Sequence, residues 1–466
     1  MTIQADAGSF RDPGNKVYRI GNSVLRGMDP ASMECFNRLN KENFYQEFLK
    51  NNFIVSAVPQ SPENKYATEI LKYGWAGVLE HDLIPFISYP YEWTFSMLKD
   101  AALLQLHLIE SSLEHDWTLK DATSYNIQWN GILPIFIDTP SLVQRTKGEQ
   151  WVGYRQFCML YLIPLMLKAY TGIQFNPLLR SQLDGVSPIE AANYFKGLNR
   201  FKKGVLTHII FPATVETRIV KNKQIASAQK RIQHTRAMVL GLVQGLQRLV
   251  QNLEIKMEDT VWSQYDKTHS YMEDAFNNKK LFVEKYVSLH TRRLTWDLGS
   301  NTGTFSEISA RHSDYVVAVD ADHDAVEKLY RKMKREKQSK ILPLFMDLSN
   351  LSPGQGWRGA ERKAFDNREQ PSLVICLALI HHIVISKNIP IAFFLDWLRE
   401  LNCEVIIEFV TPEDEMVQKL LSNKSGFNPD YELETFIREA SERFNIVDQM
   451  PLKDAKRHLF YLTPNH

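Results

Sequence analysis

The sequence predicts an α/β protein whose C-terminal part is a doubly wound parallel sheet, preceded by a mixed α/β N-terminal domain and a helical middle segment. The sheet is indicated by continuous apolar runs separated by helical patterns, as expected for strands buried on both faces. These runs span 315–319, 373–377 and 405–410. Short alternating runs between 17 and 25, followed by an amphipathic helix over 97–114, predict the mixed domain. Apolar residues at helical spacing over 239–253 predict a middle helix with one buried face.

These patterns divide the chain into three expected parts. We expect a mixed α/β domain over 1–185, a basic helical connector over 186–270 and the sheet domain over 271–466. A chain of 466 residues and 54.0 kDa is too long for one ordinary core. Its 44% hydrophobic and 23% charged residues exclude fibrous and disordered classes. The 55 basic and 54 acidic side chains produce no global field that would demand nucleic acid or an anionic membrane as a partner.

The composition also predicts a cytoplasmic protein without a membrane partner. The four cysteines are widely separated and lack the short spacing of zinc or redox motifs. Residues 1–16 are polar and lack the basic start and apolar run of an export signal. The most apolar stretch, 157–169, is interrupted by Pro164 and Lys168 and is too short to span a bilayer, so we expect a buried helix there.

A loop with two glycines marks the start of the sheet domain. A strand ends at Asp297, Gly299 and Gly303 follow in a turn, and a helix begins near Phe305. Glycines let the backbone approach a ligand beyond the carboxyl ends of parallel strands. About twenty residues later, the run 315–319 ends in Asp320, which is placed to accept hydrogen bonds from two ribose hydroxyls. The loop lacks the G-x-G-x-x-G fingerprint of dinucleotide-binding domains, whose helix N-terminus binds a pyrophosphate.

The segment DLGSNTGTFS, followed by VVAVDAD, resembles motifs I and II of class I S-adenosylmethionine-dependent methyltransferases. The last 200 residues or so look like a nodulation-protein-like subgroup of that family, on segments such as IIEFVTPEDEMVQKLL. The resemblance implies a Rossmann-like sheet with S-adenosyl-L-methionine as cofactor. It also implies a methionine pocket at Asp297 and the glycines, a ribose contact at Asp320 and an adenine contact at Asp347. The cofactor-binding positions that it implies are Asp297, Gly299, Asn301, Gly303, Asp320, Ala321, Asp347 and Leu348.

Three side chains are candidates for catalysis. His381 and His382 follow the run 373–377, so they are expected near its carboxyl edge, and imidazole is suited to removing a proton near neutral pH. Either histidine is a base for the methyl acceptor, or it packs and bonds to the backbone. Glu408, in the run 405–410, is expected at the end of its strand and either orients an acceptor or is a solvated strand-end carboxylate.

The N-terminal part resembles the kinase and aminoglycoside phosphotransferase superfamily at one place. Asp121 and Asn126 are five residues apart, and Asp138 follows a short apolar strand. In that superfamily this arrangement supplies a catalytic carboxylate and two metal-binding residues. No glycine-rich phosphate loop is evident between Phe10 and Arg26. The alternatives are a structural turn with hydrogen-bonding side chains, a noncatalytic kinase-like fold that binds the acceptor, and a second, phosphorylating activity.

The segment 196–256 carries twelve lysines and arginines against two glutamates, which either solvate helix faces or attract an acidic substrate such as RNA or a phosphorylated metabolite. The predicted function is methyl transfer from S-adenosyl-L-methionine to an O- or N-acceptor, a small molecule or a protein, without a metal. The alternatives are a cofactor-sensing scaffold and the bifunctional protein described above.

Overall fold

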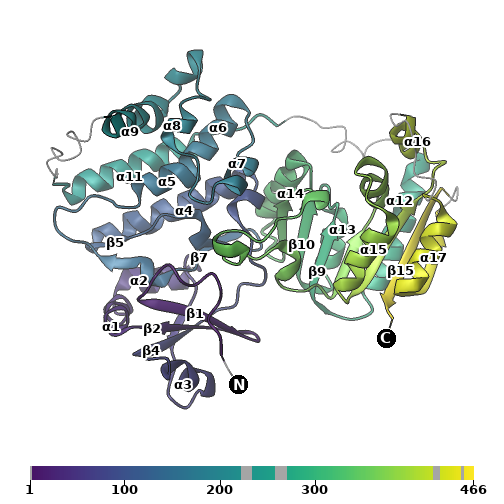
Figure 1. Ribbon diagram of the computed structural model, residues 1–466, viewed down its shortest axis with the longest axis horizontal. Coiled ribbons are helices and arrows are strands. Elements are labelled where there is room, and N and C mark those ends of the chain that lie inside the picture. The colour runs from purple at the N-terminus through teal and green to yellow at the C-terminus, as the bar shows by residue number, and fades with distance from the viewer. Residues whose placement is uncertain (1–2, 222–232, 258–269, 423–430, 453–455, 466) are drawn as a thin grey trace. The chain divides into compact units, whose positions relative to one another are not determined.

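A computed structural model describes residues 3–221, 233–257, 270–422, 431–452 and 456–465 of the chain (Figure 1). They form two compact units. Unit 1 comprises 1–129, 133–256 and 355–362, and unit 2 comprises 130–132, 257–354 and 363–466. Unit 1 therefore includes residues 1–129 and 133–185 of the expected N-terminal domain and 186–256 of the expected connector. The basic residues Lys223, Lys230 and Arg231 of that connector lie outside the described residues.

The first part of unit 1 is an antiparallel sheet with the strand order β1-β2-β4-β3. Its strands are β1 (Asn15–Ile20), β2 (Ser23–Met28), β3 (Ala57–Pro59) and β4 (Gly77–His81). The helices between them are α1 (Pro30–Leu39), α2 (Asn43–Lys50) and α3 (Lys65–Leu71). The alternating runs predicted between 17 and 25 are confirmed as the β1–β2 hairpin. Gly21, with φ of 58°, makes its two-residue turn with Asn22.

The second part of unit 1 is built around the predicted helix, which is α4 (Phe95–Glu114). Thr94 caps it by accepting the N–H of Met97, and the apolar side chains of α4 are buried along most of its length. Two short strand pairs follow, namely β5 (Trp117–Leu119) with β8 (Leu142–Gln144), and β6 (Ile127–Asn130) with β7 (Leu133–Phe136).

The remaining helices of unit 1 are α5 (Tyr154–Phe157), α6 (Ile163–Thr171), α7 (Asn176–Ser181), α8 (Pro188–Ala191), α9 (Phe211–Lys221) and α11 (Arg236–Gln251). The predicted middle helix is confirmed as α11, which packs against α4. The stretch predicted as a buried helix forms α5, a π-turn at Cys158–Leu162 and α6, with Pro164 in the first turn of α6. Of the helices in the described ranges, none is long and apolar enough to cross a membrane.

Unit 2 contains the predicted doubly wound sheet, with the strand order β11-β10-β9-β12-β13-β15-β14. Its strands are β9 (Arg292–Leu298), β10 (Ser313–Asp320), β11 (Ile341–Phe345), β12 (Leu373–Cys376), β13 (Glu404–Val410), β14 (Phe444–Pro451) and β15 (Arg457–Pro464). The strands from β11 to β13 pair in parallel. A final antiparallel hairpin, β14 and β15, extends the sheet beyond β13.

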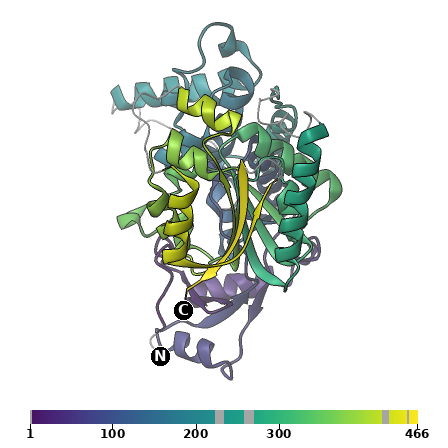
Figure 2. The same ribbon diagram turned by 90° about the vertical axis from the view of Figure 1, so that its right-hand side faces the viewer.

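Helices cover both faces of this sheet (Figure 2). They are α12 (Ser270–Val287), α13 (Thr304–Ala310), α14 (His323–Glu336), α15 (Ile391–Glu400), α16 (Glu415–Ser422) and α17 (Leu433–Arg443). Helices α12 and α13 pack together, as do α15 and α17. One core cluster joins Phe282, Val283 and Tyr286 of α12 to apolar side chains of β12, β13 and β15.

The order of the strands decides where a ligand site can lie. The chain passes from β9 outward to β10 and β11, and then returns to the other side of β9 to form β12 and β13. The connections therefore diverge between β9 and β12, beyond whose carboxyl ends open α/β sheets bind ligands. The glycine loop after β9 and the two histidines after β12 both lie at this edge.

Candidate functional site

The loop after β9 takes a backbone form that glycine permits. Gly299 and Gly303 have φ of 79° and 88°, and Asn301 between them has φ of 48°. A Cβ atom on Gly303 would lie 2.4 Å from Cδ1 of Leu329 in α14. The N–H groups of Gly299 and Ser300 both donate to the carbonyl of Val319 in β10, at 2.8 and 3.0 Å. The loop is therefore a cradle in which added side chains at the glycines are disfavoured.

Asp320, at the end of β10, holds this loop in place. Its Oδ2 accepts the N–H of Asn301 and its Oδ1 accepts the N–H of Asp322, both at 2.8 Å. Burial raises the pKa of this carboxyl. A carboxylate has about four acceptor positions, so two remain for ligand hydroxyls. The neighbouring Ala321 is exposed at the same strand end.

Asp297 lies inside the fold beneath the loop and is 2% exposed. Its Oδ2 accepts a 2.5 Å hydrogen bond from Oγ of Ser306 in α13. Burial raises the pKa of Asp297 to about 7, although the bond from Ser306 acts in the opposite direction. The nearby Oγ of Ser300 is buried and has no hydrogen-bond partner within the described ranges. A polar ligand in the cradle would supply such a partner.

Asp347, which follows β11, begins the short turn η8 (Leu348–Asn350). It accepts hydrogen bonds from the N–H and Oγ of Ser349 and, at 2.8 Å, from Nζ of Lys387. Although burial acts to raise it, the bonds from Lys387 and Ser349 keep the pKa of Asp347 below its ordinary value. The three predicted acidic positions thus end the neighbouring strands β9, β10 and β11 at one edge of the sheet.

The two histidines come from the segment after β12, where Ala378 has φ of 49° and a π-turn spans His382–Ser386. Their ring centroids are 4.2 Å apart. Burial lowers the pKa of both, and that of His381 falls well below its ordinary value. Nδ1 of His381 is buried with no hydrogen-bond partner in the described part of the chain. Both rings are therefore neutral at neutral pH, and Nδ1 of His381 has no protein partner among the described residues.

Glu408 is fully buried, so the alternative of a solvated strand-end carboxylate is wrong. Its Oε2 accepts the N–H of Ala378 at 2.7 Å and Nζ of Lys279 at 2.5 Å. Nη1 of Arg457 lies 3.6 Å from Oε1. Although burial acts to raise it, Lys279 and Arg457 lower the pKa of Glu408 to about 2. Lys279 was not among the residues predicted from the sequence, although it falls on the apolar stripe of α12 that Phe282, Val283 and Tyr286 continue.

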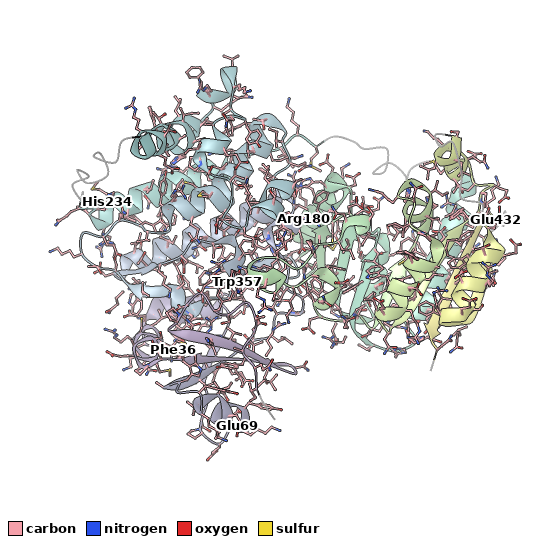
Figure 3. The ribbon with its side chains drawn as sticks, in the orientation of Figure 1. Phe36, Glu69, Arg180, His234, Trp357 and Glu432 are labelled. Carbon is pink, nitrogen blue, oxygen red and sulfur yellow. The ribbon has the colours of Figure 1, made fainter. Side chains whose placement is uncertain are left out.

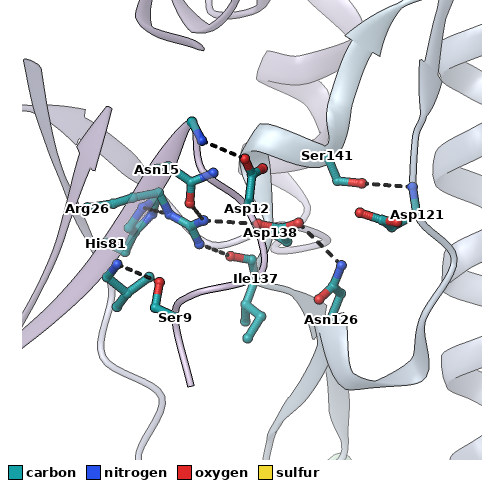
Figure 4. Close-up of polar contacts among 12 residues, drawn as sticks. Ser9, Asp12, Asn15, Arg26, His81, Asp121, Asn126, Ile137, Asp138 and Ser141 are labelled. Atoms are coloured by element: carbon teal, nitrogen blue, oxygen red, sulfur yellow. Dashed lines mark hydrogen bonds and ion pairs between the residues drawn. The ribbon is translucent and has the colours of Figure 1, made fainter. Parts of the chain in front are cut away.

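Unit 1 brings the three kinase-like positions together (Figure 4). Nδ2 of Asn126 is 3.3 Å from Oδ2 of Asp138, and Nη1 of Arg26 in β2 is 3.0 Å from Oδ1 of Asp138. Burial and the neighbouring Asp138 raise the pKa of Asp121. Each carboxylate oxygen of Asp138 thus accepts one hydrogen bond from a protein donor, and that of Oδ1 comes from a cation. Over the described ranges, no group of three His, Cys, Asp or Glu side chains is arranged to hold a metal ion.

A cavity of about 220 Å³ lies in the same unit. Its lining includes Phe36 and Cys35 of α1, Lys120 and apolar residues of the segment 139–143. Phe36 is labelled in Figure 3. Lys120 also donates to Oδ2 of Asp12 at 2.6 Å. Arg26 and Asp12 were not predicted here, because both come from the N-terminal hairpin region, far from Asp138 along the chain.

No family model matches the sequence. The chain is 30% identical over 460 residues to nodulation protein NoeA of Rhizobium meliloti (strain 1021), across 97% of this chain and 95% of that protein. Among solved structures it is similar to the N-methyltransferase NodS from Bradyrhizobium japonicum WM9 in complex with S-adenosyl-L-homocysteine. That match has 14% identity and a TM-score of 0.33, over 45% of this chain and 94% of NodS. A SAM-dependent methyltransferase from Aquifex aeolicus matches with 11% identity and a TM-score of 0.30, over 44% and 98% of the two chains.

The raised pKa of Asp297 predicts a pH-dependent stability. Because the folded carboxyl binds its proton up to about pH 7 and the unfolded one only to about pH 4, folding stability falls as pH rises between these values and levels off above 7. Asp297→Asn removes this titration. We expect the difference in free energy of unfolding, variant minus wild type, to increase with pH by on the order of 1 kcal/mol per pH unit between pH 5 and 7. Urea unfolding followed by tryptophan fluorescence measures this.

The matched control is Asp314→Asn, which changes an exposed carboxylate at the opposite end of the neighbouring strand β10. Its stability profile should run parallel to that of the wild type. A parallel profile for Asp297→Asn as well would contradict the protonation assigned to Asp297.

Proposed function

We propose that this chain, which belongs to the family of nodulation protein NoeA, is an S-adenosyl-L-methionine-dependent methyltransferase. One observation carries the proposal: Asp320 closes a glycine cradle beside the buried Asp297 at the edge of the sheet where the connections diverge. The unpartnered Oγ of Ser300 and the left-handed glycines fit a polar ligand lying close to the backbone.

Each predicted residue has a place in this proposal. Asp320 accepts the ribose hydroxyls with the acceptor positions that the loop leaves open, and Asp297 accepts the ammonium group of the methionine part. Asp347, held by Lys387 and followed by Leu348, lies at the next strand end for the adenine amino group. When bound, the cofactor supplies a methyl group activated by its sulfonium. The protein therefore needs to align an acceptor and take its proton.

His381 and His382 are the proposed bases for that proton. Both are neutral because burial lowers their pKa values, and a neutral imidazole accepts a proton directly. The unpartnered Nδ1 of His381 makes it the stronger candidate. Glu408 contributes through Ala378, whose N–H it accepts, and so fixes the segment that carries both histidines.

Unit 1 is proposed as the part that recognises the methyl acceptor, an O- or N-nucleophile on a small molecule or a protein. Its cavity beside Phe36, with Lys120 and Cys35 in the lining, supports a ligand-binding role. A second, phosphorylating activity is less well supported, because the guanidinium of Arg26 lies 3.0 Å from Oδ1 of Asp138 and its positive charge would repel a metal ion there. The lysines and arginines of the segment 196–256 would attract a methyl acceptor that carries negative charge.

Calorimetric titration of the full chain with S-adenosyl-L-methionine and S-adenosyl-L-homocysteine tests the cofactor. We expect Asp320→Ala to weaken binding by about 1 to 3 kcal/mol, roughly 5- to 150-fold, through the lost hydrogen bonds to a charged acceptor. Asp314→Ala, at the other end of β10, serves as the control and should bind as the wild type does. Absence of binding by the folded wild-type chain would contradict the proposal.

The histidines are tested by transfer of a radiolabelled methyl group to components of a cell extract. His381→Ala or His382→Ala should lose on the order of 10²-fold or more in transfer, with cofactor affinity unchanged, because the base acts on the acceptor. Full transfer by both variants would overturn the assignment of a histidine base. Cofactor binding by the wild type without any labelled acceptor would instead favour the cofactor-sensing scaffold.

A further inference from the structure

A lysine is buried in unit 2 at the edge of the sheet that carries the glycine loop. Lys279 of α12 is 8% exposed, and its Nζ lies 5.4 Å from the ring centroid of Phe305. Burying an ammonium group is costly unless it is paired and hydrogen-bonded. The N–H groups of the buried Nζ of Lys279 therefore need hydrogen-bond acceptors close by.

The protein supplies only part of that set. Nζ donates to Oε2 of Glu408 at 2.5 Å, and this is its one hydrogen bond to the described residues. An ammonium group has three N–H donors, so two remain for another acceptor. Glu408 is itself shared, because Arg457 lies 3.6 Å from its other oxygen. Nε of Arg457 also donates to Oδ2 of Asp414 at 2.9 Å, so Lys279 and Arg457 together face two carboxylates. The two open N–H donors of Lys279 therefore remain for a further acceptor.

Other polar atoms at this edge also lack hydrogen bonds. Three buried atoms have no hydrogen-bond partner in the described ranges: Oγ of Ser300, Nδ1 of His381 and Oε1 of Glu408. Ser300 follows β9, His381 follows β12 and Glu408 lies in the second half of β13, and these three strands are neighbours in the sheet. The charge of Lys279 lowers the pKa of His381, and that of Asp297 raises the pKa of Lys279, so these groups lie near one another. Hydrogen-bond donors and acceptors without a protein partner therefore occur together at this edge of the sheet, beside both a cation and a carboxylate.

We propose that Lys279 binds the carboxylate of an α-amino-acid group whose ammonium is accepted by Asp297. This assignment rests on the proposed function and identifies the residue that recognises the amino-acid end of the cofactor. A zwitterion matches a site with one buried carboxylate and one buried ammonium group that has two open N–H donors. A phosphate dianion matches it poorly, because it would meet the carboxylates of Asp297, Asp320 and Glu408.

The test compares three ligands by calorimetry on the full chain. S-adenosyl-L-methionine carries the carboxylate, decarboxylated S-adenosylmethionine lacks only that group, and 5′-methylthioadenosine lacks the whole amino-acid part. Lys279→Met alone would remove the nearest positive charge from the buried carboxylate of Glu408 and so endanger folding. The principal variant is therefore the double substitution Lys279→Met with Glu408→Gln. Lys279→Arg retains the charge as the conservative variant.

We expect the double variant to bind S-adenosyl-L-methionine at least tenfold more weakly than the wild type, and to bind the other two ligands within about twofold of it. Glu408→Gln alone should retain most of the preference for the carboxylate, and Lys279→Arg should restore part of it. Lys280→Met is the matched control, since Lys280 is the next residue of α12 and its Nζ lies over the ring of Phe276 at 4.3 Å.

Equal losses for the ligands with and without the carboxylate would overturn the assignment, because the substitution would then act on the fold of the site. Unchanged affinity for S-adenosyl-L-methionine in the double variant would overturn it as well. If the folded wild type binds none of the three ligands, the proposed function fails and this assignment fails with it. If wild type and double variant both bind 5′-methylthioadenosine but do not differ in affinity for S-adenosyl-L-methionine, only the assignment of Lys279 fails and the proposed function stands.

Discussion

The carboxylate of Asp320 accepts the backbone N–H groups of Asn301 and Asp322, and these two bonds join the loop after β9 to the turn after β10. The loop contains left-handed backbone at Gly299, Asn301 and Gly303, a form that needs support from its surroundings. Asparagine tolerates this conformation better than most residues, which explains its place between the glycines. The same carboxylate therefore shapes the cradle and faces the ligand that the cradle is proposed to hold.

Burial of charge is the second constraint on the site. Asp297, Lys279 and Glu408 are all withdrawn from water, so each must be neutralised or bonded within the fold. Asp297 meets this requirement by a raised pKa and the bond from Ser306, whereas Glu408 stays ionised between two cations. Because Glu408 also accepts the N–H of Ala378, the charge pair sets the path of the segment that leads to His381. The electrostatics of the core and the position of the proposed base are thus coupled.

The sheet and its acidic strand ends were predictable from the sequence for a local reason. A strand buried on both faces is a continuous apolar run, and a glycine turn followed by a helix requires particular residues at particular positions. The loop from Asp297 to Gly303 and the strand ending in Asp320 could therefore be located without the fold. The hairpin of β14 and β15 was less visible, because β14 alternates between buried and exposed residues and lacks a continuous apolar run.

The partners of buried charges could not be predicted in this way. Lys279 and Glu408 are 129 residues apart, and Arg26 and Asp138 are 112 apart, so only the tertiary fold decides that they meet. The lysine was detectable in principle from its position on the apolar stripe of α12, but its acceptor was not.

The acidic positions of unit 1 show the limit of spacing as evidence for chemistry. Asp121, Asn126 and Asp138 do come together, as the kinase-like pattern indicates. Their function depends on what occupies their oxygens, and Arg26 from a distant strand takes one oxygen of Asp138 while Asn126 takes the other. A carboxylate paired with a guanidinium stabilises the junction of strand and loop, and the positive charge of Arg26 opposes a metal ion at the same oxygen. Asp121, with its raised pKa and no such bond to its side chain from the described residues, is the group in this cluster that remains available to a ligand.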